Sequence, residues 1–455
     1  ILWGDGTQTI IDNGNVSPNS CFHEYASSGT YDILIYSYDS KIPRFSFQEV
    51  DDYPVCLTEV NTPLLRMINL DGTTATNLEG IFYGASNLTY IPNNLFDNNT
   101  TATNFSYCFY GADNLGLKIP ESLFSKCLEM RDASYIFANT TCVIPTGIFN
   151  NNTKLENLSY AFNNRGGKLY PIDADKIFMT LINLTNLEGC FSSSLVSSFP
   201  NLNNNLKLQN VSKMFFQVET KSRIYIPTYY FRNNVNITNF SYCFSDINYS
   251  GESSAGVYFN ENIFCDESTE MGTRFAGKTI DFSNCTVPQL WNYTFGAVNK
   301  TSCFSGENNK HLTNYYIIPE EWGGPYKENS MVLIIDTNLN QETQNKYSLP
   351  WMSTTYSNIG NITIDWGDGN TTSISNKEIT NNNKSHTYNR AVSSAITITS
   401  DNGNIPPFEL IAGEEIYCTL LQEVVTPLLH MCDPFTGEGI TTLSCFAGCT
   451  NLISV

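Results

Sequence analysis

Asn-Phe-Ser-Tyr-Cys-Phe, at Asn104–Phe109, is the stretch that decides the fold, because close copies of it return along the chain. Asn-Leu-Ser-Tyr-Ala-Phe follows at Asn157–Phe162, Asn-Val-Ser-Lys-Met-Phe at Asn210–Phe215, and Asn-Phe-Ser-Tyr-Cys-Phe again at Asn239–Phe244. An internal period of roughly 20 to 50 residues is typical of repeat architectures, in which each repeat is one structural unit. The sequence therefore predicts a stack of similar units rather than one globular core.

The phenylalanine that ends this motif belongs to a longer series, which we call the Phe ladder. Its members lie about 28 residues apart on average. One unit of that length cannot bury its apolar side chains alone, whereas stacked units bury them against each other. We therefore expect nine coils of a β-solenoid with the Phe ladder inside. The ladder consists of Phe82, Phe109, Phe137, Phe162, Phe191, Phe215, Phe244, Phe275 and Phe304, and Phe446 holds the same place in a later copy.

A second apolar-Phe pair follows most ladder positions, after an Ile-Pro pair. In the first repeat, Leu88–Ile91 is β-prone, Pro92 follows it, and Leu95-Phe96 comes next. Because proline lacks an N–H, it ends the short strand that we expect there. Asparagine-rich spacers such as Asn150–Asn152 suit turns, because asparagine bonds its local backbone and tolerates left-handed dihedral angles. We expect these spacers on outer loops.

A longer repeat relates the two ends of the chain. Residues from Trp3 to Tyr25 match residues from Trp366 to Tyr388 at an offset of 363, and Leu57–Leu65 matches Leu421–Leu429 at an offset of 364. The chain thus holds one full unit of a tandem array and the start of the next. The turn residues that recur are Trp3, Asp5, Gly6, His23 and Tyr25 in the first copy, and Trp366, Asp368, Gly369, His386 and Tyr388 in the second.

The segments around these turns alternate apolar and polar residues over short runs, as in Asn361–Trp366 and Ala395–Ile398. This pattern predicts a small β-sandwich, with Asp-Gly in a tight hairpin turn. Met331–Asp336 is its expected first strand, and the N-terminal copy has no counterpart of that strand. We expect an exposed apolar edge there, filled by upstream residues of a parent chain or by a neighbouring subunit.

Two of these patterns resemble known modules. The Trp-Gly-Asp-Gly turn, followed by His23-x-Tyr25 and Gly29–Ile33, resembles the PKD-like domain of immunoglobulin type. Phe-x-x-Cys/Ala-x-x-Leu followed by Ile-Pro-x-x-x-Phe is similar to the BspA-like leucine-rich repeat, most closely at Cys445–Leu452. Together they imply a family of bacterial and protist surface proteins that is linked with adhesion. The resemblance implies no catalysis.

The expected fold class is mainly β, with a β-solenoid of leucine-rich repeats flanked by PKD-like β-sandwich domains in tandem. Residues 1–41 form the first sandwich without its first strand, and residues 42–327 form the solenoid. Residues 328–403 form the second sandwich, and residues 404–455 begin a second solenoid. Because the chain opens within a strand-like motif and ends within a repeat, we expect an internal fragment of a longer polypeptide.

The composition excludes several classes of partner. The chain has 24 basic and 44 acidic residues, and a net charge of −20 repels nucleic acid and anionic membranes. No apolar run approaches the roughly 20 residues that span a bilayer, so we expect no membrane insertion in this segment. Charged residues make up only 15% of the chain. Amide, hydroxyl and aromatic groups therefore supply much of the surface.

Twelve of the 14 cysteines fall into two groups. Five stand directly before a ladder phenylalanine, where other repeats have apolar residues, and these we expect to be buried thiols. They are Cys108, Cys190, Cys243, Cys303 and Cys445. Seven others are candidates for disulfides without assignable pairs, because surface proteins are often cross-linked. They are Cys21, Cys56, Cys127, Cys142, Cys265, Cys285 and Cys449.

His23 and His386 occupy equivalent places, and each lies in the same copy as a repeated aspartate. A metal site or an acid/base pair is one interpretation, but we expect a structural hydrogen bond between the histidine and the turn. Asp365–Asn370 also resembles an acidic loop that could hold Ca²⁺. Since the first copy has Leu2 in place of Asp365, the ligand set differs between copies and we expect no cofactor.

Asn-x-Ser/Thr triplets are frequent, as expected in a chain rich in these residues. In the repeat motif the asparagine alternatively forms an internal ladder along the stack. The acceptors that we single out for glycosylation are Asn87, Asn99, Asn139, Asn183 and Asn292.

No nucleophile elbow, P-loop or zinc-protease motif occurs, so we expect no enzyme. The leading hypothesis is an extracellular, cell-surface repeat protein that mediates adhesion or recognition through multivalent contacts. Its partner would be a protein or glycan on a host cell, the matrix or a neighbouring particle. The alternative is a structural fibre, sheath or filament subunit, including a virion appendage, that assembles through its own repeats. The expected contact residues are Tyr90, Tyr107, Tyr110, Tyr135 and Tyr160.

Overall fold

The computed structural model describes most of the chain. The described residues are 1–11, 21–47, 56–113, 119–164, 172–220, 223–245, 248–249, 256–259, 263, 280–281, 298–300, 303, 318–324, 326–409, 415–432, 446 and 449–453. Six residues named above lie outside these ranges, namely Phe275, Phe304, Cys265, Cys285, Cys445 and Asn292.

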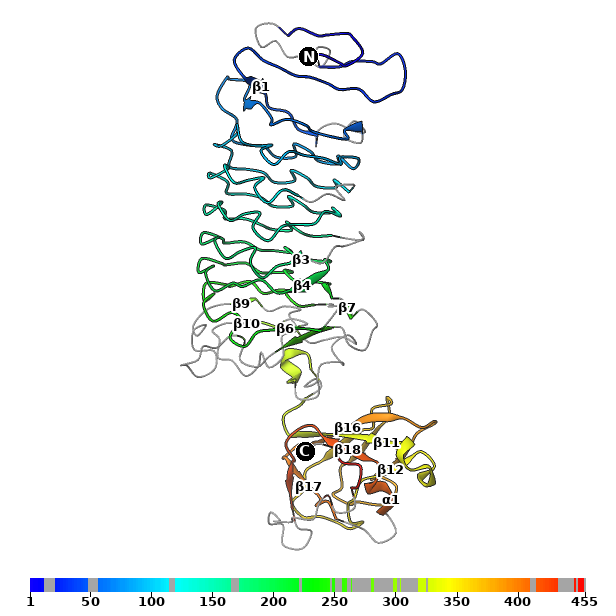
Figure 1. The fold of residues 1–455 in the computed structure, drawn as a ribbon. Coiled ribbons are helices and arrows are strands. Elements are labelled where there is room, and N and C mark those ends of the chain that lie inside the picture. Colours follow the sequence, from blue (N-terminus) through cyan, green and yellow to red (C-terminus); the bar gives the residue numbers. More distant parts are fainter. Residues whose placement is uncertain are drawn as a thin grey trace. The chain divides into compact units, whose positions relative to one another are not determined.

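The chain is mainly β and divides into two compact units, Ile1–Lys300 and Thr301–Val455 (Figure 1). The sequence predicted that the solenoid ends at residue 327 and that the second sandwich begins at residue 328. The two compact units instead divide between Lys300 and Thr301.

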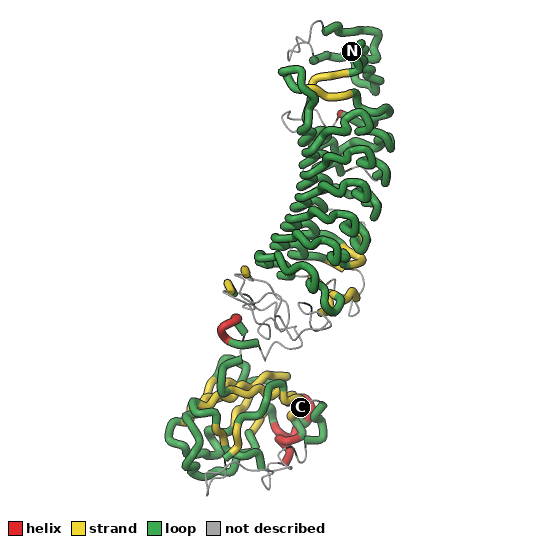
Figure 2. Tube along the Cα trace, turned by 90° about the vertical axis from the view of Figure 1, so that its left-hand side faces the viewer, coloured by secondary structure: helices red, strands yellow, loops and turns green. Residues whose placement is uncertain are grey.

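The first unit is a series of coils stacked on one another (Figure 1). Its short strands pair in parallel two by two, and most of each coil consists of turns (Figure 2). The pairs are β1 (Lys41–Pro43) with β2 (Arg66–Ile68), β3 (Ile172–Asp173) with β4 (Val196–Ser198), β5 (Glu219–Thr220) with β7 (Asn248–Tyr249), β6 (Arg223–Ile226) with β8 (Gly256–Phe259), and β9 (Ile280–Asp281) with β10 (Val298–Asn299). The strand predicted at Leu88–Ile91 is reduced to one bridge, between Tyr90 and Glu59.

Alternate backbone N–H groups connect each coil to the next. Around the first ladder position, the N–H of Gly80 donates to Ser106 O at 2.9 Å and that of Phe82 donates to Cys108 O at 2.8 Å. The next N–H, on Tyr83, instead closes a turn within the coil, onto Gly80 O at 3.1 Å. The same alternation recurs in the following coils up to Phe215. Both sets of buried donors therefore find acceptors, as a buried backbone requires.

Residues two before each ladder phenylalanine have a positive φ. The φ values lie between 53° and 65°, in the left-handed region. The residues are Gly80, Tyr107, Tyr135, Tyr160, Gly189, Lys213 and Tyr242. Only two of the seven are glycine, so five side chains stand where the backbone conformation costs about 1–2 kcal/mol.

The Phe ladder is buried, and its rings stack coil on coil from Phe82 to Phe244. The centroids of the seven successive rings lie 5.3–6.4 Å apart, with interplanar angles of 4–21°. A second row, Phe96, Phe124 and Phe149, stacks in the same way at 5.5 and 5.9 Å. These contacts confirm that the ladder is buried from Phe82 to Phe244, with a second row of rings in three of its coils.

The buried asparagines are not those that the repeat motif predicted. Asn104 and its counterparts do pair between coils, but their side chains are partly exposed and each accepts a hydrogen bond from the N–H two residues on. Asn152, from a spacer predicted to be an outer loop, is completely buried. Its Nδ2 donates to Phe124 O at 3.1 Å and to Cys127 O at 2.8 Å. Asn205 and Asn234 repeat this pattern.

The outer-loop prediction was therefore wrong for Asn152. Each of these three asparagines meets two carbonyl oxygens of the preceding coil that also accept a backbone N–H within their own turn, as Phe124 O does from Cys127 at 3.0 Å and Cys127 O does from Met130 at 3.2 Å. A primary amide can serve both, because it carries two N–H bonds on one nitrogen. The hydrogen bonds also fix the side chain towards the core rather than towards solvent.

Two of the proposed disulfide cysteines are instead buried thiols. Cys127 and Cys142 are free and almost fully buried, as are Cys108 and Cys190, for which burial was predicted. Burial raises the pKa of both the Cys127 and the Cys142 thiols to about 12. The disulfide interpretation of Cys127 and Cys142 was wrong because both positions point into the stack, where each thiol packs as a small apolar group.

The second unit is built on a five-stranded antiparallel sheet in the order β14-β13-β16-β11-β18. The strands are β11 (Ser330–Asp336), β13 (Ile362–Asp365), β14 (Thr371–Ile374), β16 (Ser393–Ser400) and β18 (Leu421–Val424). Smaller pairs join β12 (Lys346–Ser348) to β15 (Ser385–Thr387), antiparallel, and β17 (Asn404–Ile405) to β19 (His430–Met431), parallel. Short helices complete the unit, namely α1 (Glu415–Cys418) and the 3-10 turns Glu320–Trp322, Thr337–Leu339 and Gln341–Thr343.

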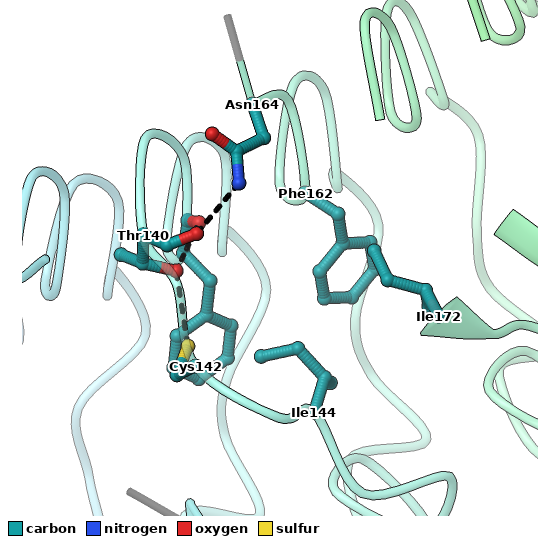
Figure 3. A pocket seen from close by; sticks show the side chains of 7 residues that line it. Thr140, Cys142, Ile144, Phe162, Asn164 and Ile172 are labelled. Carbon is teal, nitrogen blue, oxygen red and sulfur yellow. Dashed lines mark hydrogen bonds between the residues drawn. The ribbon is translucent and has the colours of Figure 1, made fainter. Parts of the chain in front are cut away.

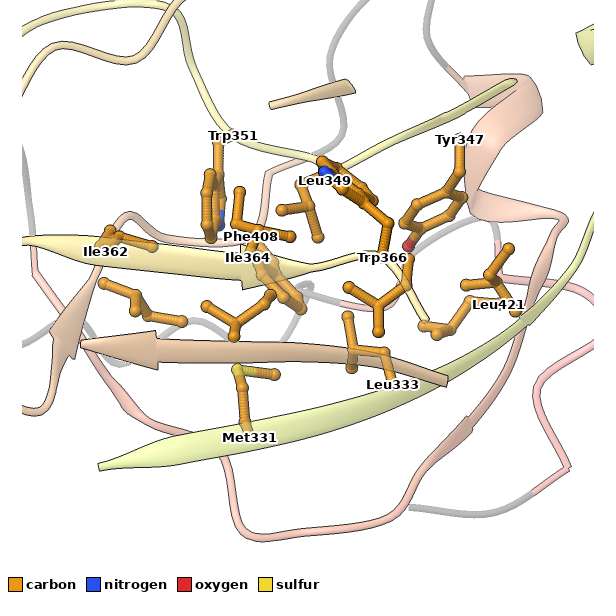
Figure 4. Close-up of a cluster of buried hydrophobic side chains, with 14 of the residues drawn as sticks. Met331, Leu333, Tyr347, Leu349, Trp351, Ile362, Ile364, Trp366, Phe408 and Leu421 are labelled. Carbon is orange, nitrogen blue, oxygen red and sulfur yellow. The ribbon is translucent and has the colours of Figure 1, made fainter. Parts of the chain in front are cut away.

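The core of this unit lies on one face of the sheet and is filled by alternate side chains (Figure 4). Met331 and Leu333 of β11 and Ile364 of β13 belong to this cluster, with Trp351 and Trp366 over them. Leu421 of β18 belongs to the same cluster. The sheet thus extends past residue 403 into the segment predicted to begin a second solenoid.

A cavity mutation tests the ladder. We expect Phe109→Ala to lower the free energy of unfolding by about 3–5 kcal/mol, because the ring is completely buried between Phe82 and Phe137. Urea unfolding followed by circular dichroism measures the change. Leu128→Ala is the control, since that side chain is 53% exposed and should cost little. Equal effects of the two substitutions would contradict the buried ladder.

Candidate interaction surface

Five tyrosines lie side by side on neighbouring coils of the first unit. Tyr107, Tyr135 and Tyr160 stack in sequence, with ring centroids 4.6 and 4.8 Å apart. Tyr83 and Tyr110 form a parallel stack at 4.8 Å, and Tyr107 contacts both of them at tilted angles. All five rings are half-buried. We call these residues, Tyr83, Tyr107, Tyr110, Tyr135 and Tyr160, the Tyr row.

Three members of the Tyr row occupy the left-handed positions described above. Tyr107, Tyr135 and Tyr160 have φ values of 56°, 54° and 53°. Bulky residues rarely adopt this conformation, and strained residues concentrate where a protein binds or reacts. Gly80 and Gly189 stand at the same place in other coils. The backbone therefore accepts glycine here, and the tyrosines are present for their side chains.

The Tyr row ends where the ring of Tyr160 lies against the backbone of Gly189. A Cβ atom at this position would lie 2.3 Å from Cε1 of Tyr160, so the ring of Tyr160 covers the bare backbone. The hydroxyl of Tyr160 donates to Oε1 of Glu188 at 3.2 Å. On the adjoining coil, Nδ2 of Asn139 donates to the hydroxyl oxygen of Tyr110 at 2.7 Å. Amide and carboxylate groups thus border the rings.

Four members of the Tyr row keep their protons at neutral pH. Burial raises the pKa of Tyr83, Tyr107, Tyr135 and Tyr160, and neighbouring groups raise it further. For Tyr160 the second cause is Glu188, whose negative charge opposes ionisation. The row consequently presents uncharged hydroxyl groups and ring edges, while its ring faces are largely occupied by each other.

Four of the five contact residues predicted from the sequence belong to the Tyr row. Tyr90 does not, because it lies on the bridge to Glu59 and has no described ring partner. Sequence reasoning missed Tyr83. The signal was present, since Tyr83 follows Phe82 just as Tyr110 follows Phe109.

The candidate glycosylation residues differ in exposure. Asn87 is exposed, and Asn139 and Asn183 are partly exposed. Asn99 is completely enclosed; its Oδ1 accepts from the N–H of Met67 at 2.9 Å and its Nδ2 donates to Leu65 O at 3.1 Å. The folded chain leaves no room for a glycan on Asn99, and that prediction was wrong.

The duplicated turn assembles the same cluster twice. Nε2 of His23 lies 2.7 Å from Oδ2 of Asp5, and Nε2 of His386 lies 2.8 Å from Oδ2 of Asp368. Each histidine stacks on the tryptophan of its own copy, at 4.9 and 5.3 Å. The tyrosine hydroxyl donates to the carbonyl of that tryptophan at 2.8 and 2.9 Å. This is the predicted hydrogen bond between histidine and turn.

The carboxylates of the second turn are used within the fold. Oδ1 of Asp365 accepts from the N–H of Gly367 at 2.9 Å, and Oδ1 of Asp368 accepts from the N–H of Asn370 at 3.0 Å. Over the ranges that the structure describes, no three His, Cys, Asp or Glu side chains are grouped so that they could hold a metal ion. The cluster orders the hairpin.

A small crevice opens between two coils, beside Cys142 (Figure 3). Its lining includes the rings of Phe137 and Phe162, and Nδ2 of Asn164 donates across it to Thr140 O at 2.7 Å. Its volume of about 20 Å³ has room for roughly one water molecule. This space is too small for an organic substrate.

The chain matches no protein-family model, no curated protein and no solved structure. Within the described segments, no helix has the length and the apolar character that crossing a membrane requires.

Substituting two left-handed glycines tests the packing of the Tyr row. Gly189→Ala should destabilise the chain more than Gly111→Ala, although both residues have a positive φ. Each pays the backbone strain of about 1–2 kcal/mol. The added methyl group meets the ring of Tyr160 in the first case, but only backbone atoms of Gly84 at 3.7 Å or more in the second. Thermal unfolding compares the two, and equal losses would contradict the contact.

Acid titration tests the duplicated turn. Hydrogen bonds from Thr7 and then His23 lower the pKa of Asp5 from 3.8 to about 2. A carboxylate with a lowered pKa stabilises the folded state above its ordinary pKa, and this contribution is lost as the pH falls through about 2. Thr7→Val should raise the pKa of Asp5, measured by carboxyl carbon NMR, more than His23→Ala does. A wild-type midpoint near 3.8 would contradict the hydrogen-bond network.

Proposed function

We propose that this chain is a non-catalytic recognition segment of an extracellular surface protein. In this proposal the first unit is a solenoid of BspA-like leucine-rich repeats, and the second unit is a PKD-like sandwich. The segment binds a protein or glycan on a host cell, on the matrix or on a neighbouring particle. The stacked Phe ladder and the duplicated turn support these module assignments.

The Tyr row is the single observation that carries the proposal. Its half-buried rings offer large contact area at a low cost in side-chain entropy, because tyrosine has few rotatable bonds. Since the ring faces are mutually stacked, a partner meets edges and hydroxyl groups, bordered by Asn139 and Glu188. Such a surface suits a partner rich in hydrogen-bonding groups, as glycans and exposed peptide chains are.

Repetition supports a multivalent mode of binding. The near-constant offset of 363 to 364 residues places the same motifs at fixed intervals along a tandem chain. When several weak sites engage together, the apparent affinity rises by roughly 10² to 10⁴. The net charge of −20 would limit indiscriminate binding to anionic surfaces.

One observation favours the alternative, a structural fibre that assembles through its own repeats. Four consecutive apolar or aromatic side chains, from Ile33 to Tyr36, are about half exposed in the N-terminal copy. Exposed runs of this kind promote association between chains.

A binding comparison tests the Tyr row. The triple variant Tyr107→Gly, Tyr135→Gly and Tyr160→Gly removes three rings while keeping a backbone that Gly80 and Gly189 already adopt. We expect retention on immobilised host-cell, matrix and particle surfaces to fall about tenfold or more, or ~1.4 kcal/mol. Tyr225→Ser is the control, because Tyr225 is 52% exposed and outside the row.

The number of units provides a second test of the same proposal. Tandem chains should be retained more strongly than the single chain, and the triple variant should lose that gain. Equal retention at every unit number, or turnover of a glycan or peptide substrate, would overturn the proposal. Concentration-dependent polymers of the chain, without a second partner, would favour the fibre.

A further inference from the structure

The second copy of the duplicated module places one strand between two others. β11 pairs with β16 on one side, from Ser330 opposite Thr399 to Asp336 opposite Ser393. On the other side β11 pairs with β18, where the N–H of Val425 donates to Val332 O at 3.0 Å and the N–H of Val332 donates to Oγ1 of Thr426 at 2.8 Å. β11 is thus the centre of this end of the sheet.

The first copy keeps the strand pairs that lie on both sides of β11 in the second copy. Leu2 pairs with Leu34 and with Gln8, as Asp365 pairs with Thr397 and with Thr371 in the second copy. Further along, Lys41 pairs with Arg66 just as Asn404 pairs with His430. These equivalences follow the sequence offsets of 363 and 364. The frame around β11 therefore recurs, while residues 1–455 hold only one strand of the β11 sequence.

The side chains that β11 helps to cover are uncovered in the first copy. Ile396 and Ile398 of β16 are 0% exposed, whereas their counterparts Ile33 and Ile35 are 51% and 48% exposed. The exposed apolar area lies on the core face of the module, because Ile396 and Ile398 point into the core cluster of the second unit. An apolar face of this kind is costly in water.

Among the described residues, no strand pairs with either of the two backbone edges that would meet the missing strand. Leu34 directs its N–H and C=O to Leu2, at 2.9 and 2.8 Å. In an antiparallel strand the neighbouring residues, Ile33 and Ile35, direct theirs to the opposite side. On the other flank, Val60 and Thr58 use their backbone groups towards the next coil, at Tyr90 and Thr89.

The groups of Val425 and Thr426 that bond to β11 also have counterparts in the first copy. Thr62 and Asn61 stand where Thr426 and Val425 bond Val332 in the second copy, and both are exposed. The first copy thus retains the backbone groups and a threonine hydroxyl at the same places. Their arrangement fits one more extended chain.

We propose that residues 30–37 and 57–62 form a strand-acceptor site, which takes up an extended segment with the sequence character of β11. The occupant runs antiparallel to residues 30–37. It directs alternate apolar side chains, like those of Met331, Leu333 and Ile335, onto Ile33 and Ile35. Backbone hydrogen bonds supply affinity and the alternate side chains supply specificity. This site is separate from the Tyr row and does not depend on the proposed function.

A peptide of the β11 sequence tests the site on the full chain. The probe is a fluorescent peptide that spans Lys327–Asn340, and the readouts are anisotropy and hydrogen–deuterium exchange. We expect saturation at one peptide per chain and slower exchange in residues 30–37 and 57–62. A control peptide with aspartate at the three positions of Met331, Leu333 and Ile335 should not bind.

Variants of the acceptor complete the test. Ile35→Pro removes an N–H that faces the open edge and should abolish binding. Ile33→Glu leaves the backbone intact but places a charge on the apolar face, so it should also abolish binding. Leu34→Thr introduces the residue that the second copy has at the equivalent position, Thr397. Because the side chain of residue 34 lies on the face opposite to Ile33 and Ile35, this variant should leave binding unchanged. Failure to bind, protection confined to other segments, or binding that survives both Ile35→Pro and Ile33→Glu would overturn the proposal.

Discussion

The alternation of backbone N–H groups is the constraint on which the first unit depends. One N–H donates to the next coil, and the following one closes a turn within its own coil, as Phe82 and Tyr83 illustrate. This alternation requires a left-handed residue two positions before each ladder phenylalanine. It also sets the distance between coils, so that the rings of the Phe ladder come into contact. Ring stacking then adds roughly 0.5–1.5 kcal/mol for each pair.

Sequence patterning identified the parts of the fold that depend on apolar side chains. The Phe ladder, β11 and the Trp-Gly-Asp-Gly turns lie where the periodicity placed them, because burial of large apolar groups is the main driving force and leaves a regular record. The same holds for Cys108 and Cys190, which take an apolar position in the repeat.

The predictions that were wrong concern residues whose side-chain direction is set by hydrogen bonds to the backbone rather than by the polarity of the side chain. Asn152 lies in a run of three asparagines, yet only its side chain donates to two carbonyls of the coil before it. Asn99 is enclosed for a similar reason. The strain at Tyr107 and Tyr135 was equally invisible, because a sequence records which residue is present and not the sign of its φ.

The coil-to-coil bonds also determine how the first unit bears tension. Because they point from one coil to the next, a pull along the stacking direction loads every interface in series, and the weakest one parts first. The ladder rings are farthest apart between Phe137 and Phe162, at 6.4 Å, and the crevice beside Cys142 lies at the same interface. Fewer dispersion contacts oppose separation there. A chain pulled through this unit would yield at that interface while the coils on either side remained folded.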